Sequence, residues 1–300
     1  MSIGPTCRAW DFPSAWDLIS KTIIDMKKFF FLTLSMLLLA APAMEARKSL
    51  KVMSYNIRLG IADDGDNSWM YRRPATIAML EKEAPDVFGL QEAFKFQQDF
   101  ITENLPQYKA VGVGRDDGID KGERMSILYN SEKVELLDWG TYWLSETPDV
   151  PSFGWDAKCR RTATWAKLRL IKGGKEFFYV NTHLDHKGRE ARRRGLAMVL
   201  ERIGAMNPKG LPMVLTGDFN VKPDDECLID LNQVMQDARF VAKASEKGHT
   251  FHGWGNTKSV IDYVYFSGFH HCERYHIVSE RFVGVPYISD HYPVTAVLVF

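Results

Sequence analysis

Residues 212–220 read Pro-Met-Val-Leu-Thr-Gly-Asp-Phe-Asn, and this stretch is the most informative part of the sequence. Its apolar run lies between turn-forming residues, which is the pattern of a buried strand. Gly217, Asp218 and Asn220 stand at the end of that strand. Because a strand end presents side chains into a cleft on a rigid support, the stretch predicts one corner of a catalytic site.

Five other predicted strand boundaries carry polar residues of the same kind. A single Asn or Asp at a strand end is usually a turn former, and a single histidine there is more often a half-buried residue with satisfied hydrogen bonds. The shared position of the whole set is what favours a functional site. Its members are Asn56, Glu92, His183, Asp218, Asn220, Asp262, Asp290 and His291.

The chain alternates strand patterns with helix patterns and has no internal repeat or low-complexity linker. Several of the strands are almost wholly apolar, as strands covered on both faces are. We therefore predict a single domain, residues 47–300, built as an α/β sandwich of packed sheets with helices outside. The predicted strands are residues 51–55, 86–90, 125–129, 162–170, 176–181, 212–216, 261–266 and 294–300, and the predicted helices are residues 73–84 and 189–203.

The amino-terminal segment has the pattern of an export signal. Met26 and two lysines precede an apolar run over residues 29–39, and the small residues 41–43 suit a signal peptidase. The run is short for a transmembrane helix, so we expect cleavage rather than a retained anchor, which is the alternative. Residues 1–46 are predicted to be leader and signal peptide, with translation starting at Met26. The mature protein is then periplasmic or secreted and has no stable membrane anchor.

Charge and cysteine content limit which binding partners and disulfides we expect. Lys plus Arg and Asp plus Glu both number 38, so the chain of 300 residues has no net charge. General nucleic-acid binders usually have a basic excess, so we expect no strong general affinity for nucleic acid. Cys159, Cys227 and Cys272 follow the leader without metal-ligand spacing, which leaves open one disulfide plus a thiol or three thiols.

Three of the strand-end residues have the chemistry of a metal site. Asn56, Glu92 and Asp290 offer oxygen ligands, which a hard cation such as Mg²⁺ prefers. Mg²⁺ keeps several waters and takes one or two protein carboxylates, so Glu92 with Asn56 would suffice.

The other five residues suit phosphate chemistry. His183 and His291 can hydrogen-bond phosphate oxygens or move protons, and Asp262 can fix the tautomer of His291 and favour its charged form. Asp218 can orient or deprotonate an attacking water, with Asn220 holding that water or the phosphate. The set fits metal-assisted hydrolysis of a phosphate ester.

Three further residues are expected to bind substrate. Arg160 belongs to a Cys-Arg-Arg segment before a strand, from which one arginine can reach a phosphate; a solvated strand start is the alternative. Trp69 and Arg72 follow Asn56 and combine an aromatic ring with a cation, as in a substrate wall. Trp69 can equally staple the helix that follows.

The sequence resembles the endonuclease/exonuclease/phosphatase superfamily, also called DNase I-like, over residues 50–300. Six motifs occur in the family's order, which is far more specific than any one of them. The motifs are Ser54-Tyr55-Asn56-Ile57, Leu90-Gln91-Glu92, Asn181-Thr182-His183-Leu184, Gly217-Asp218-Phe219-Asn220, Ile261-Asp262-Tyr263 and Ser289-Asp290-His291-Tyr292-Pro293-Val294. The resemblance implies a four-layer α/β sandwich, with two mixed sheets flanked by helices, and phosphoester hydrolysis that depends on Mg²⁺ or Mn²⁺.

The resemblance also implies a role for each motif residue. Glu92 would be the principal metal ligand, with Asn56 beside it and Asp290 completing the metal neighbourhood. The remaining residues would act on water and phosphate: Asp218 would position the water with support from Asn220, and His183 and His291 would contact the scissile phosphate, with Asp262 behind His291.

Within this family the substrate stays open among DNA, RNA, phospholipid and small phosphate esters. Residues 221–223 read Val-Lys-Pro where inositol-polyphosphate phosphatases tend to carry Tyr-Arg, and intracellular abasic-site endonucleases do not suit an exported protein. We expect an exported, monomeric bacterial phosphoesterase of the phosphodiesterase or nuclease type, with a secreted nuclease or a sphingomyelinase-type enzyme as alternatives. A non-catalytic binding protein that kept the fold is the alternative outside enzymes, and the complete motif set argues against it.

Overall fold

The computed structural model describes residues 49–300 together with Met1 and Gly4, and residues 49–300 belong to one compact unit. The expected leader, start site and signal peptide fall on residues 1–46, which lie outside the described residues apart from Met1 and Gly4. Within residues 49–300, no helix has both the length and the apolarity that crossing a bilayer requires.

Two mixed sheets form the centre of this unit. In both, parallel neighbours (β1 with β2, β7 with β8) lie among antiparallel ones. The first sheet has the strand order β10 (Ala244–Ser245), β12 (His271–Ile277), β13 (Val294–Val299), β1 (Ser49–Asn56), β2 (Val87–Gln91), β4 (Ile127–Asn130) and β3 (Tyr108–Val111). The second has the order β5 (Val134–Trp143), β6 (Thr162–Leu170), β7 (Glu176–His183), β8 (Met213–Asp218), β11 (Asp262–Ser267) and β9 (Gln236–Asp237).

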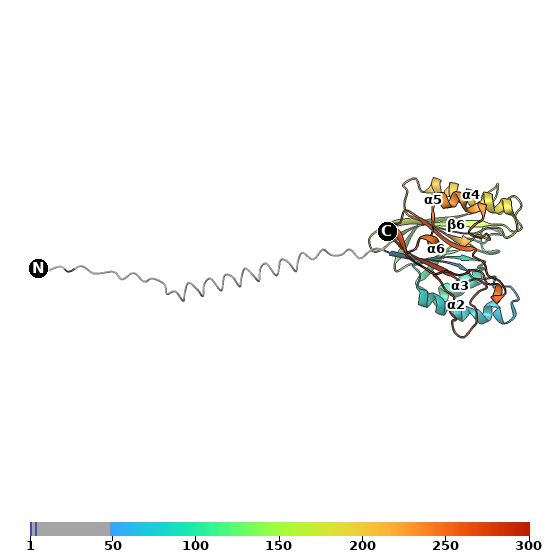
Figure 1. Cartoon of the computed structure of the whole chain (residues 1–300), viewed down its shortest axis with the longest axis horizontal. Helices are drawn as coiled ribbons and strands as arrows, with labels where there is room; N and C mark the ends of the chain where they lie inside the picture. The colour runs from blue at the N-terminus through green and yellow to red at the C-terminus, as the bar shows by residue number, and fades with distance from the viewer. Residues whose placement is uncertain (2–3, 5–48) are drawn as a thin grey trace. The chain divides into compact units, whose positions relative to one another are not determined.

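Helices cover the outer face of each sheet, as Figure 1 shows. The helices α2 (Trp69–Glu83) and α3 (Lys95–Asn104) lie on the first sheet, and α4 (Arg189–Met206) and α5 (Ile229–Val234) lie on the second. The short α6 (Ala238–Val241) contacts β11 and β12, and three 3-10 turns, Gly65–Asn67, Glu226–Leu228 and Gly253–Gly255, lie in the connections. The predicted four-layer sandwich is confirmed.

Three apolar cores correspond to the three contacts between layers. Between the sheets, Val52 and Val87 pack with Tyr179 and Val214, and all four are fully buried. The other two cores join each sheet to its helices. Because the central strands are covered on both faces, they need apolar side chains in both directions, which explains why β8 is buried at every position.

The predicted elements are present, and several others were not predicted. The strand over residues 162–170 is β6 with the same bounds, whereas α2 begins at Trp69, four residues before the predicted start. The unpredicted strands are β3, β5, β9, β10 and β12, and the unpredicted helices are α3, α5 and α6. Of these, β5 and β12 carry charged residues and contain register shifts, which hide the period of two that identifies a strand.

A polar layer lies between the sheets directly beneath the strand ends. Asn181 of β7 accepts a hydrogen bond from Gln91 Nε2 of β2 (2.6 Å) and donates to the carbonyls of Leu90 (2.8 Å) and Ser126 (3.1 Å). Thr216 Oγ1 of β8 also contacts Asn181 Oδ1, at 3.2 Å. Since buried polar groups require partners of defined geometry, this layer sets how the two sheets face each other.

Candidate active site

The strand ends of both sheets meet at one cleft of about 430 Å³. In the first sheet, Asn56 is paired in register with Gln91, which precedes Glu92. In the second, His183 and Asp262 are each paired in register with Asp218. Six of the expected residues line the cleft, and these are Glu92, His183, Asp218, Asn220, Asp290 and His291. Asn56 and Asp262 lie behind that lining and are hydrogen-bonded to it.

Asn56 joins the two sheets at the floor of the site. Its Nδ2 donates to Glu92 Oε1 (3.1 Å) and to Asp218 Oδ2 (3.0 Å), while its Oδ1 accepts from the backbone N–H of Arg58 (3.0 Å). Glu92 Oε2 in turn accepts from the backbone N–H of Leu59 (3.0 Å). Asn56 therefore holds two carboxylates at a defined separation. Its Oδ1, which we expected to bind metal, already accepts one hydrogen bond.

Asn220 fixes both Asp218 and His183. Its backbone N–H donates to Asp218 Oδ1 (2.9 Å), and its Nδ2 donates to the carbonyl of Leu184 (3.0 Å). The same Nδ2 lies 3.0 Å from His183 Nε2, so that ring nitrogen is the acceptor and the hydrogen of the neutral ring is on Nδ1. Among residues 49–300, the buried Nδ1 has no hydrogen-bond partner. His183, a residue of the cleft lining, therefore has one donor without a partner among these residues.

His291 is held as a cation by carboxylates. Its Nδ1 lies 2.9 Å and 3.1 Å from the two oxygens of Asp262, and its Nε2 lies 3.8 Å from Asp218 Oδ2. Burial lowers the pKa of His291, but the charges of Asp262, Asp218 and Asp290 outweigh burial and raise that pKa to about 10. Burial and then the charge of Arg161 hold the pKa of His183 well below 6.5. The two histidines thus differ in charge at neutral pH.

The acidic groups of the cleft fit a divalent cation. Burial, followed by the charge of Asp262, raises the pKa of Asp218 to about 7, and burial also raises the pKa of Asp290. Ligand atoms of Glu92, His183 and Asp218 lie within 4.8 Å of one another. Carboxylates crowded in a buried cleft favour a hard dication, because its charge compensates theirs.

Three residues around the cleft have a left-handed backbone. The φ angles are 63° at Arg58, 60° at Glu92 and 54° at Asn220. Residues with side chains rarely adopt this conformation, and it persists where the surrounding structure enforces it, often at functional sites. Here it turns the chain immediately after β1, β2 and β8 and directs the side chains into the cleft.

The structure corrects the expectation for Trp69 and Arg72, because neither lines the cleft. Trp69 is 5% exposed and packs edge-on against Phe100 in the core beneath α2. Arg72 is 1% exposed, and its guanidinium donates to four backbone carbonyls, those of Ile57, Arg58, Asn67 and Ile288. Arg72 therefore anchors the segments that carry Arg58 and Asp290 and has no donor directed at substrate.

Arg160 is also outside the lining of the cleft, which contains its neighbour Arg161 instead. Arg160 pairs with Asp116 (3.3 Å) and lies over the ring of Phe153, 4.7 Å from its centroid. Arg160 and Arg161 both lie just before β6, and only Arg161 belongs to the lining of the cleft. The sequence pointed to the pair, and the tertiary structure brings Arg161 to the cleft.

The cleft also contains residues to which the sequence gave no individual role. The signal for some was their position directly after a motif, as for Arg58 after Asn56 and His186 after His183. Phe251 had no such signal, because it reaches the cleft through an isolated bridge to His291. These additional lining residues are Arg58, Leu59, Glu123, Cys159, Arg161, His186, Phe251 and Ile261.

Comparison with known proteins places the chain in a family. Residues 53–291 match the model of the Endonuclease/Exonuclease/phosphatase family. A mannosyl-6-phosphatase structure from Bacteroides thetaiotaomicron is 36% identical, with a TM-score of 0.79 and coverage of 84% of this chain and 100% of the other.

Two further proteins are similar to this chain over most of its length. A family protein from the same organism is 35% identical, with a TM-score of 0.78 and coverage of 85% of this chain and 98% of the other. An uncharacterised protein of Acanthamoeba polyphaga mimivirus is 26% identical over 279 residues, which are 83% of this chain and 99% of that protein. The chain therefore belongs to the endonuclease/exonuclease/phosphatase family.

Proposed function

We propose that the chain is a phosphoester hydrolase that depends on a divalent cation, Mg²⁺ or Mn²⁺. The family description names endonucleases, exonucleases and phosphatases, all of which hydrolyse phosphoesters. The observation that carries the proposal is one cleft in which carboxylates suited to a hard cation lie beside buried donors suited to a phosphate.

Glu92 and Asp290 are the residues that would hold the cation, with Asp218 and Asn56 adjacent. When bound, the cation would stabilise the negative charge that develops on the phosphate. Asp218 acts on the water: its Oδ1 is fixed by the Asn220 N–H, and a pKa of about 7 suits it to accept a proton near neutral pH.

The histidines act on the phosphate. Neutral His183 offers its Nδ1–H to a phosphate oxygen. Charged His291, oriented by Asp262, stabilises the negative charge or donates a proton to the leaving oxygen. Water supplies the oxygen that phosphorus gains, and the alcohol leaves with the proton.

The relative whose title names it a mannosyl-6-phosphatase makes a sugar phosphate monoester the first substrate class to assay. The diester and nuclease activities predicted from the sequence remain part of the proposal, as does export. A panel should therefore contain hexose phosphates, bis-p-nitrophenyl phosphate, DNA and RNA, each with Mg²⁺, Mn²⁺ or a chelator.

Glu92→Gln tests the metal role directly. Losing the carboxylate charge should weaken the dependence on Mg²⁺ and the turnover together, since the same residue holds the cation. Glu176→Gln is the matched control, because Glu176 lies at the opposite end of β7 and pairs with Lys167 and Arg169. Thermal unfolding with and without the metal gives a second readout that does not need turnover.

A specific pattern of results would reject the proposal. It fails if neither metal shifts the unfolding midpoint and no ester in the panel is hydrolysed, which would favour a non-catalytic binding protein. Unchanged metal affinity in Glu92→Gln would remove Glu92 as ligand while leaving the hydrolase assignment intact.

A further inference from the structure

Arg161 is a buried cation with a spare donor in the wall of the cleft. It precedes β6 and is 5% exposed. Its Nε lies 3.5 Å from Asp185 Oδ2, and its Nη2 lies 3.2 Å from His186 Nδ1. Its Nη1 is buried and has no hydrogen-bond partner among residues 49–300. A buried charged donor without a partner is costly, so its presence points to a ligand that supplies the acceptor.

His186 extends this donor surface. A guanidinium can only donate, so Nδ1 of His186 is the acceptor and the ring hydrogen is on Nε2. His186 is exposed and lines the same cleft. Arg161 and His186 thus offer N–H groups from adjacent positions and hold each other in place.

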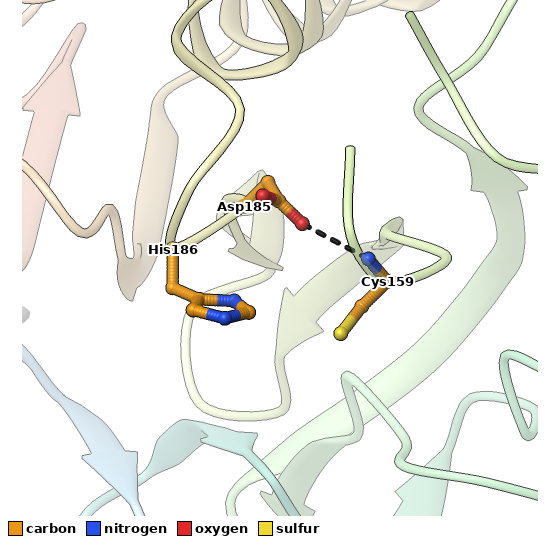
Figure 2. A group of neighbouring side chains, drawn as sticks. All are labelled: Cys159, Asp185 and His186. Carbon is orange, nitrogen blue, oxygen red and sulfur yellow. Dashed lines mark hydrogen bonds between the residues drawn. The ribbon is translucent and has the colours of Figure 1, made fainter. Parts of the chain in front are cut away.

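Cys159, Asp185 and His186 lie close enough for a metal site, but Asp185 is already saturated. Figure 2 shows its carboxylate directed at the backbone nitrogen of Cys159. Its oxygens accept four backbone N–H groups, those of Lys158, Cys159, Lys187 and Gly188, at 2.7–3.1 Å. Asp185 orders the two loops that carry Arg161 and His186, and no lone pair remains for a metal.

A second buried donor belongs to another residue of the cleft lining. The Nδ1–H of His183 also lacks a partner among the described residues, and His183 lines the cleft with Arg161. After burial, the charge of Arg161 is the next largest effect that lowers the pKa of His183. The nearby carboxylate of Glu123 is held by Arg115 through two contacts of 2.6 Å and 2.8 Å.

We propose that Arg161, supported by His186, binds the additional anionic oxygen of a phosphomonoester and makes the enzyme prefer monoesters to diesters. This inference rests on the proposed hydrolase function. A monoester carries close to two negative charges at pH 7, whereas a diester carries one and places an alkoxy group where the monoester has a charged oxygen. The metal cation, His183 and His291 would act on either ester. The guanidinium of Arg161 adds a positive charge that matches the extra negative charge of the monoester.

The test compares kcat/KM on p-nitrophenyl phosphate and bis-p-nitrophenyl phosphate, with saturating Mg²⁺ or Mn²⁺. Arg161→Met should lower kcat/KM on the monoester by about 10–100-fold, as expected for one charge-assisted hydrogen bond, and change the diester by less than about threefold. Arg160→Met is the matched control and should change neither, because Arg160 is the adjacent arginine outside the cleft. Arg161→Lys should give intermediate loss on the monoester, since it keeps the charge and loses the planar fork.

Binding of inorganic phosphate, measured by calorimetry in the presence of the metal, provides a readout without turnover. The wild-type chain should bind phosphate at least about tenfold more tightly than Arg161→Met, with unfolding midpoints confirming that both are folded. Equal losses on both esters, or equal phosphate affinity in wild type and Arg161→Met, would overturn the inference. If wild type hydrolyses neither ester, phosphate affinity alone decides whether Arg161 forms the anion subsite. The wider substrate panel and the metal-dependent unfolding midpoint then decide the proposed function.

Discussion

At the scale of single residues, the pair of Asp262 and His291 shows how the site controls charge. Thr250 Oγ1 accepts the backbone N–H groups of Ile261 and Asp262 at 3.1 Å, so the carboxylate of Asp262 is held in position behind the ring. The ring of Phe251 packs against that of His291, with centroids 4.7 Å apart. Burial alone would make His291 neutral, and the carboxylates reverse that outcome.

Asp262→Asn should therefore change the pH dependence of turnover. Removing the charge lowers the pKa of His291 from about 10, so the fraction of cation should fall as pH rises through the new, lower value. We expect a loss of about 10²–10⁴-fold in kcat at pH 8 and partial recovery at lower pH, where the imidazolium forms again. Rate against pH measures this, with the exposed Asp230→Asn as control. A profile unchanged in shape would exclude charge control by Asp262.

At the scale of elements, the junction of β9 and α6 depends on one buried carboxylate. Asp237 caps α6 by accepting the backbone N–H of Arg239 (2.9 Å), whereas its Oδ2 has no hydrogen-bond partner among the described residues. Arg239 Nε lies 3.9 Å from that oxygen. Burial outweighs these two favourable contacts and raises the pKa of Asp237 to about 6.

The consequence is a pH-dependent loss of stability. A folded-state pKa above the unfolded value of 3.8 means that Asp237 favours folding below about pH 4 and loses that contribution as pH rises through about 6. Asp237→Asn keeps the cap but does not titrate. The free energy of unfolding of this variant, relative to that of wild type, should therefore be roughly 3 kcal/mol higher at pH 8 than at pH 4. Urea unfolding at the two pH values measures the difference. An equal difference between the two proteins at both pH values would show that Asp237 does not titrate in this range.

At the scale of the whole molecule, catalysis requires two sheets in a defined relative position. Asn56 of the first sheet contacts Asp218 of the second, so a small slide of one sheet would separate the residues assigned to metal and to water. The polar layer of Gln91, Asn181 and Thr216 lies just beneath. Gly89 allows the sheets to approach there, because a Cβ at this position would lie 2.4 Å from Asn181 Oδ1 and 2.7 Å from Thr216 Oγ1.

Gly89→Ala should destabilise the protein by about 1–3 kcal/mol, since the added methyl group must displace buried polar side chains. It should also reduce turnover, because the same side chains support the strand ends. Gly204→Ala in α4 is the matched control: an added Cβ there meets no atom within 4 Å, and alanine favours a helix. Denaturant unfolding and kcat measure both effects. A neutral result for Gly89→Ala would mean that the sheets can separate without cost.

Most of the site residues could be predicted from the sequence, because the end of a strand is marked by neighbouring residues of recognisable types. The run before Asp218 is apolar since β8 is buried on both faces, and the turn formers that follow end it. The same signals located Asn56, Glu92 and His183, and family order supported them. Trp69 and Arg72 were misassigned because an aromatic ring beside cations has the same pattern at a binding wall and in a helix that packs on a core.

The sequence alone determined which polar residues stand at strand ends, and hence the chemistry of the cleft. This was possible because the apolar pattern of a strand and the turn that ends it are local properties of the sequence. Register and burial could not, because they depend on which strand lies opposite and on what covers each side chain. The tertiary structure therefore decided that Arg161, which contacts Asp185 and His186, rather than Arg160 lines the cleft. It also decided that Arg72 bonds to backbone carbonyls and that Arg161 and His183 keep spare donors.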